Sequence, residues 1–105
     1  MPKALVIRPQ AQADVDEQAA YYQATDSIST ATRFLEDVRH VFERLVHFPR
    51  LGRPWPTTNP ELTGLRRWPL PHLPYSIFYL PTATTIEIVR VLHNSRDLPP
   101  LLENL

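Results

Sequence analysis

STATRFLEDVRHVFERLVHF, residues 29–48, is the stretch of sequence that decides the fold. At 100° per residue its apolar side chains fall on one arc of roughly 160°, and charged or polar side chains occupy the rest of the wheel. The stretch contains neither proline nor glycine. It therefore predicts an amphipathic helix that buries one face. The apolar arc consists of Ala31, Phe34, Leu35, Val38, Val41, Phe42, Leu45, Val46 and Phe48.

A second helix is predicted immediately before it, over residues 10–25. The chain has 12 prolines and only 2 glycines, yet no proline lies between Gln10 and Phe48. Proline is poorly tolerated inside helices, so this gap favours two helices in succession. The polar residues 26–29 supply a break between them and a candidate N-cap. The two helices are expected to form a hairpin.

The remaining segments are strand-like or loop-like. Residues 3–8, 64–70, 75–80 and 85–93 are short, apolar and rich in β-branched or aromatic side chains, which predicts four strands. Residues 50–60 have turn chemistry and no periodicity, which predicts a loop. The order strand, helix, helix, strand, strand, strand indicates an α+β fold, with a helical hairpin packed on a mostly antiparallel sheet.

Composition limits the classes of protein that fit. The 105 residues suit one domain, expected over residues 1–97 with a tail at 98–105. Eleven Lys and Arg balance eleven Asp and Glu, so strong nucleic-acid binding through bulk positive charge is not expected. The absence of cysteine and of long apolar runs excludes thiolate metal sites and membrane spans. A cytoplasmic protein is expected.

No metal or cofactor is expected either. His40 and His47 lie on the polar arc of the second helix but two turns apart, too far to share one ion. Two glycines cannot build a phosphate-binding glycine-rich loop, and hydrolase or metalloprotease motifs are absent.

Cationic side chains concentrate in the C-terminal half of the chain. Residues 46–80 contain four arginines but only one acidic residue, a glutamate. Arg66 and Arg67 are adjacent in a predicted strand, so they point to opposite faces of the sheet. Strict alternation places Arg90 on the same face as Ile86, Ile88 and Leu92, and places Glu87 and His93 with Val89 and Val91. An arginine among apolar neighbours needs a carboxylate or a bound anion, and pairing inside the protein is the favoured explanation.

Three further residues have both a structural and a functional interpretation. His93 ends the last strand, where a hydrogen-bonded structural histidine is more common than a catalytic one, although its ring titrates in a useful range. Trp55 lies in a proline-rich segment and is either a core residue or a contact residue. Tyr21 lies off the apolar arc of its helix and is either a surface ring or an anchor for a partner.

Two segments resemble a known family. ATRFLEDVRHVFERLVHFPRLGRPW (31–55) resembles the second helix and following loop of ParE toxins in the RelE/ParE superfamily, and LRRWPLPHLPYSIFYLPTATTIEIVRVLHNSRD (65–97) resembles their last three strands. The shared features are the F-P-x-x-G-R-P turn over 48–54, the Leu65-Arg66 pair, the Tyr75-x-Ile77-x-Tyr79 pattern and the R-V-L-H-x-x-R-D ending over 90–97. Together they cover roughly residues 5 to 97.

This resemblance implies a toxin of a type II toxin–antitoxin pair, neutralised by a small antitoxin in a hetero-oligomer that can bind DNA through the antitoxin. ParE-like members poison DNA gyrase by binding and use no catalysis. RelE-like members cleave mRNA on the ribosome, which would make His93, Arg66 and Arg90 the catalytic candidates here. Zero net charge and a single lysine favour the gyrase-binding alternative. An inactive interaction module or co-repressor is a third alternative.

The two expected surfaces can be assigned to residues. The target-binding residues are expected to be Arg66, Arg67, Arg90, His93, Arg96 and Trp55. The antitoxin is expected to cover apolar side chains that the first helix leaves exposed, because its apolar stripe is thin compared with the arc on the second helix. Those side chains are Tyr21, Phe34, Val41 and Phe48.

Overall fold

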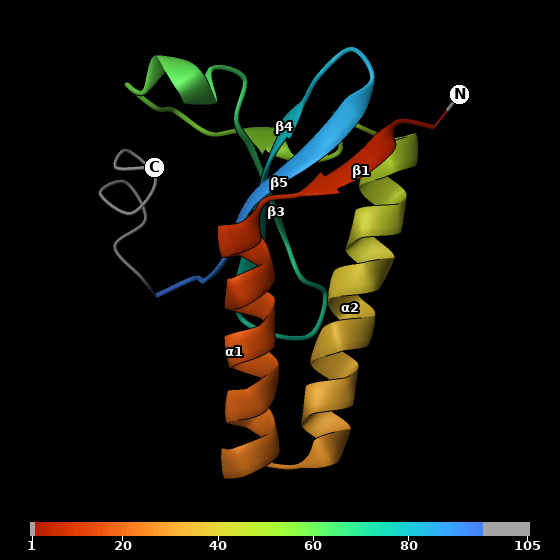
Figure 1. Ribbon diagram of the computed structural model, residues 1–105, viewed down its shortest axis with the longest axis vertical. Helices are drawn as coiled ribbons and strands as arrows, with labels where there is room; N and C mark the ends of the chain where they lie inside the picture. Colours follow the sequence, from red (N-terminus) through yellow and green to blue (C-terminus); the bar gives the residue numbers. More distant parts are fainter. Residues whose placement is uncertain (1, 96–105) are drawn as a thin grey trace.

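The computed structural model describes residues 2–95 and shows two helices on one face of a five-stranded sheet (Figure 1). The strands lie in the order β1-β5-β4-β3-β2. The predicted α+β fold and both predicted helices are confirmed. The elements are β1 (Ala4–Ile7), α1 (Pro9–Thr25), α2 (Ile28–His47), β2 (Arg53–Pro54), the 3₁₀ turn η1 (Pro60–Leu62), β3 (Arg66–Pro69), β4 (Tyr75–Pro81) and β5 (Thr85–His93).

The sheet is mixed. β1 runs parallel to β5, whereas β5, β4, β3 and β2 pair antiparallel.

Both helices of the hairpin begin at residues suited to a helix N-terminus. Pro9 occupies the first turn of α1, where its missing N–H costs nothing. Ser27 caps α2, because its Oγ accepts the backbone N–H of Thr30 at 3.0 Å.

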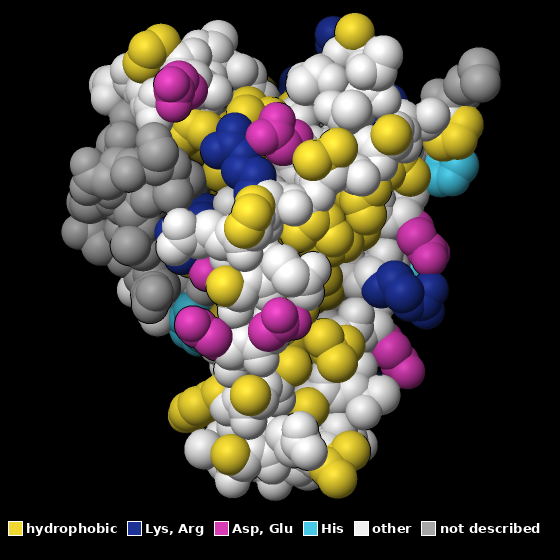
Figure 2. Space-filling view, in the orientation of Figure 1, with side chains coloured by type: hydrophobic (Ala, Val, Ile, Leu, Met, Phe, Trp, Pro, Cys, Tyr) yellow, Lys and Arg dark blue, Asp and Glu magenta, His cyan; other side chains and the backbone are white. Residues whose placement is uncertain are grey.

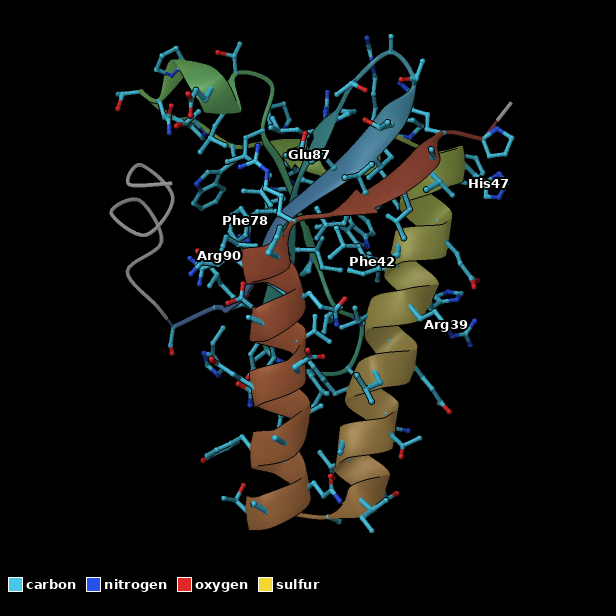
Figure 3. The ribbon with its side chains drawn as sticks, in the orientation of Figure 1. Arg39, Phe42, His47, Phe78, Glu87 and Arg90 are labelled. Carbon is cyan, nitrogen blue, oxygen red and sulfur yellow. The ribbon has the colours of Figure 1, made fainter. Side chains whose placement is uncertain are left out.

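Each face of the sheet carries a cluster of buried apolar side chains. On the helical face, Phe34 and Leu45 of α2 pack against Ile77 and Ile88 of the central strands. In Figure 3, Phe42 points from α2 toward the sheet while Arg39 points away from the body of the molecule. The opposite face carries a smaller cluster, covered by residues between β2 and β3 rather than by a helix. Its members are Leu62, Leu65, Phe78, Leu80, Val89 and Leu92, with Trp55 packed against them.

The prediction that residues 50–60 form only a loop is wrong. Arg53 pairs with Arg67 and Pro54 with Arg66, so a two-residue edge strand, β2, closes this side of the sheet. Proline is allowed there because an edge strand can leave one row of donors unpaired. So short a strand has no periodicity of its own, and only the long-range pairing with β3 creates it.

The strict alternation predicted along the last strand is also wrong. Phe78 pairs with Arg90 but the next residue, Tyr79, pairs with Ile88, so Val89 is an extra residue in a β-bulge. Beyond the bulge every side chain changes face. Val89 therefore lies in the smaller cluster, whereas Val91 lies on the helical face.

Two of the expected antitoxin contacts belong to the chain's own core. Phe34 is 0% exposed and Val41 is 2% exposed, so the expectation that they lie outside the core is wrong. The helical wheel could not show what packs on this face. In the fold, the rings of Tyr22 of α1 and Tyr75 of β4 pack against Phe34 and bury it. Tyr21 and Phe48 are exposed, at 58% and 60%.

The F-P-x-x-G-R-P turn is tied to the sheet by one buried tyrosine. The Tyr79 hydroxyl donates to the carbonyl of Pro49 at 2.9 Å and accepts the N–H of Gly52 at 2.8 Å. A Cβ on Gly52 would lie 2.7 Å from that hydroxyl and 2.8 Å from the carbonyl oxygen of Arg67. Glycine is required here by close approach. Gly64, the other glycine, has φ of +90° but open space around it.

Gly52→Ala and Gly64→Ala form a matched pair that separates these two constraints. Gly64→Ala is expected to cost about 1 kcal/mol of unfolding free energy, because only backbone strain opposes it. Gly52→Ala is expected to cost about 2–4 kcal/mol, because the methyl group displaces Tyr79 and breaks its hydrogen bonds. Urea unfolding of both variants is the measurement. Equal losses would contradict the close-approach explanation.

Tyr79 also predicts a dependence of stability on alkaline pH. Burial raises the pKa of its hydroxyl, with the Gly52 N–H and the Arg66 charge opposing the shift. In the unfolded chain tyrosine ionises near pH 10, so the stabilisation is complete below about pH 10 and is lost as pH rises through the higher folded-state pKa. Tyr79→Phe is expected to be less stable at neutral pH and to lose less stability between about pH 9 and about pH 11. Identical pH slopes in urea unfolding would contradict this.

Candidate functional site

Arg90 forms a buried ion pair with α1. Its Nε and Nη2 donate to the two carboxylate oxygens of Asp14 at 2.8 and 2.9 Å, and the backbone N–H of Val91 donates to the same carboxylate at 3.0 Å. The side chains of Arg90 and Asp14 are only 8% and 13% exposed. Figure 3 shows Arg90 beside the N-terminal half of α1. The internal carboxylate favoured from the sequence is confirmed, and Asp14 is the partner that the sequence analysis missed.

Arg66 and Arg67 point to opposite faces of the sheet, as predicted. Arg66 donates to the carbonyls of Arg50 and Gly52, which fixes it against the turn after α2. Arg67 donates through Nε to Ser76 Oγ at 2.9 Å and through Nη2 to Asn94 Oδ1 at 3.2 Å. Both guanidinium groups are thus positioned by neutral oxygens and not by carboxylates.

His93 is satisfied by its immediate neighbours. Its Nδ1 accepts the backbone N–H of Ser95 at 3.0 Å and lies 2.7 Å from Ser95 Oγ. The ring also packs edge-on against Tyr75, with centroids 5.0 Å apart. Because Nδ1 is an acceptor, the proton of the neutral ring lies on Nε2. This is the structural alternative that the sequence analysis considered for His93.

The expected target-binding residues do not form one cluster. Trp55 and Arg67 come together, because the guanidinium of Arg67 lies 5.3 Å from the centre of the Trp55 ring. They line a hollow of about 460 Å³ at the β2–β3 edge of the sheet. Arg90 and His93 face α1 and Tyr75 instead, and Arg96 lies outside the described residues. Sequence reasoning missed that Arg53 and Trp68 also line this hollow, because both depend on the β2–β3 pairing.

Within residues 2–95, no three His, Asp or Glu side chains gather in a way that could hold a metal ion. In the same range, no helix is long and apolar enough to cross a bilayer.

Comparison with known proteins identifies the family. Residues 5–98 match the family model described as the ParE toxin of the type II toxin–antitoxin system parDE. This chain belongs to the ParE toxin family. A solved structure of the chromosomal ParDE system from P. aeruginosa has the same fold, with a TM-score of 0.71 and 22% sequence identity over 87% of this chain and 95% of that one. None of the curated proteins matches the sequence.

Apolar side chains are exposed on the toxin on the side where the two helices meet β1. Figure 2 shows hydrophobic atoms between the helices and along β1, with acidic side chains spread over both helices. Leu5 and Val6 of β1, Leu35 of α2, and Phe48 after it are among the exposed large hydrophobic residues. Leu35 and Phe48 belong to the apolar arc predicted from the sequence but are not buried by the toxin itself.

The Asp14–Arg90 pair predicts a specific pattern of stability in the toxin. Asp14→Ala is expected to lower the unfolding free energy by about 3–5 kcal/mol, because it leaves a buried arginine unpaired and also removes the acceptor for Val91. The double variant Asp14→Leu with Arg90→Met is expected to recover part of this loss. Asp16→Ala, on the exposed side of α1, is the control and should change stability by at most about 0.5 kcal/mol. A loss below about 1 kcal/mol for Asp14→Ala in urea unfolding would contradict the assignment.

Proposed function

We propose that this toxin arrests growth by binding and poisoning DNA gyrase, without catalysis, and that a cognate antitoxin neutralises it. Gyrase poisoning is typical of ParE toxins, and membership of that family supports the proposal. The observation that carries the choice of binding over RNA cleavage is that the three candidate catalytic groups are held apart in separate internal contacts.

General acid–base cleavage requires the groups to reach the same substrate atoms. Arg66 pairs with Tyr79, whereas His93 pairs with Tyr75 on the same strand β4. Four residues of strand separate these two positions by roughly 14 Å. Arg90 is occupied by Asp14 at 2.8 Å. This arrangement favours a protein that presents a fixed surface to its target over a ribonuclease.

The exposed apolar residues support an antitoxin-binding surface. Tyr21 and Phe48 remain candidates, whereas Phe34 and Val41 are withdrawn because they are buried. β1 is an edge strand whose Leu5 and Val6 are 41% and 44% exposed. An extended or helical antitoxin segment that orders on binding could cover these side chains.

Two assays of purified toxin, run side by side, test the proposal. One measures gyrase supercoiling together with trapped cleaved DNA, and the other measures ribosome-dependent cleavage of mRNA. We expect trapped DNA and intact mRNA at micromolar toxin. Codon-positioned cuts in mRNA with unaffected gyrase would overturn the proposal, and absence of growth arrest on induction would favour an inactive co-repressor.

Arg67→Gln tests the proposed target surface against a control on the opposite side of the fold. Arg67→Gln removes a charge held beside Trp55 and is expected to reduce gyrase inhibition about tenfold or more. Arg39→Gln removes an equal charge from the exposed face of α2, where Arg39 pairs with Glu43, and is expected to leave inhibition unchanged. Antitoxin binding should be retained by both variants, which shows that they fold. Equal inhibition by the two variants would exclude the Arg67 surface.

A further inference from the structure

Two hollows at the β2–β3 edge of the sheet are lined by cationic side chains. One, of about 460 Å³, is lined by Arg53 and Arg67, and the other, of about 450 Å³, by Lys3, Arg50 and Arg66. Pro54 of β2 lines both, so the hollows adjoin. Among residues 2–95, no Asp or Glu lines either one. Five of the eleven Lys and Arg therefore line two adjoining hollows in a protein whose net charge is zero, with Arg66 and Arg67 on opposite faces of the sheet.

Three of these cations, Lys3, Arg66 and Arg67, differ from Arg8, Arg39 and Arg90 in the partners that hold them. Arg8, Arg39 and Arg90 pair with carboxylates, which cancel their charge. Lys3 instead donates to the carbonyl of Thr82, and Arg66 and Arg67 donate to carbonyl, hydroxyl and amide oxygens. Neutral partners fix a cation in place without neutralising it. Such groups are prepared for an anion from outside the chain.

Aromatic rings lie in the same place. Trp55 and Trp68, the only two tryptophans of the protein, both line the first hollow, together with Pro54, Pro56 and Pro69. Both indoles are partly exposed. The ring of Trp55 packs edge-on against Phe78, with 5.5 Å between the ring centroids, and the guanidinium of Arg67 lies over the Trp55 ring. A rigid indole beside fixed cations is the arrangement on which nucleic-acid bases stack while their phosphates are neutralised.

We infer that this basic–aromatic edge, formed by Lys3, Arg50, Arg53, Trp55, Arg66, Arg67 and Trp68, binds single-stranded DNA. Stacking on an indole requires an unpaired base, so duplex DNA is a poorer ligand. The choice of DNA over RNA rests on the proposed function, because gyrase holds DNA with cleaved strands at its active site. Binding by the isolated toxin is expected to be weak, since five cations provide only a limited number of phosphate contacts.

Tryptophan emission reports on this edge, because Trp55 and Trp68 both line its first hollow, Trp55 packing against the smaller cluster and Trp68 against the helical-face core. Adding oligo(dT) of about ten nucleotides at low salt to the purified toxin is expected to quench the emission. The logarithm of the binding constant should fall linearly with the logarithm of the salt concentration, with a slope of about −0.7 for each phosphate neutralised. Arg53→Glu is expected to weaken binding about tenfold and to make that slope shallower by at least about 0.7.

Arg39→Glu is the matched control, since it changes net charge equally on the exposed face of α2 and should leave binding and slope unchanged. Absence of quenching by oligo(dT) at about 100 μM would overturn the inference. So would equal quenching by poly-glutamate, equal losses in the two variants, or tighter binding of oligo(U) than of oligo(dT).

The gyrase assay separates this inference from the proposed function. If Arg53→Glu loses oligo(dT) binding and also traps less cleaved DNA on gyrase, both are supported. If it loses oligo(dT) binding but traps as much as wild type, the DNA-binding edge and the proposed function both stand, and the edge has no part in poisoning. If wild-type toxin poisons gyrase but oligo(dT) does not quench its emission, the inference fails while the proposed function stands. If wild-type toxin leaves gyrase untouched but binds oligo(dT) through Arg53, the proposed function fails and the DNA-binding edge stands.

Discussion

The Asp14 carboxylate is the contact on which the arrangement of helices and sheet depends. It receives three hydrogen bonds, two from the guanidinium of Arg90 and one from the backbone N–H of Val91. Both donors follow the β-bulge at Val89, where the change of register turns the strand. One side chain of α1 thus neutralises a buried charge, satisfies a backbone donor near an irregular point of the ladder and fixes the helix on β5. Removing the carboxylate would leave both donors without their partner, which is costlier than never having buried them.

A second clamp organises the other end of the sheet. Tyr79 holds the turn after α2 through Pro49 and Gly52, and the Gly52 carbonyl in turn accepts from Arg66. The turn leads into β2, and β2 brings Arg53 and Trp55 beside Arg67. The basic–aromatic edge is therefore a consequence of how the turn is anchored. A substitution at Gly52 would displace Tyr79 and so alter the position of the turn that leads into this edge.

The two clamps give arginines of one chain different roles. Arg90 is neutralised and buried, so its main contribution is to the fold. Arg66 and Arg67 are held by neutral oxygens and remain electrostatically active at the surface. This difference explains how a protein with equal numbers of acidic and basic residues can present a locally cationic face. Side chains fixed in this way lose little conformational entropy when they bind a partner.

The sequence by itself determined the two helices, the order along the chain of four of the five strands, and the need for a partner for Arg90. These follow from periodicity, proline placement and the cost of an unpaired buried charge, which are local properties. Only the tertiary structure decided that Asp14 is that partner, that Val89 is a bulge, that β2 exists and that Phe34 and Val41 are core residues. Each of these depends on contacts between residues far apart in the chain, such as Arg53 with Arg67 or Tyr22 with Phe34 and Tyr75. A helical wheel or a strand alternation pattern describes a single helix or strand. Neither contains information about what packs against that element or where the strand register shifts.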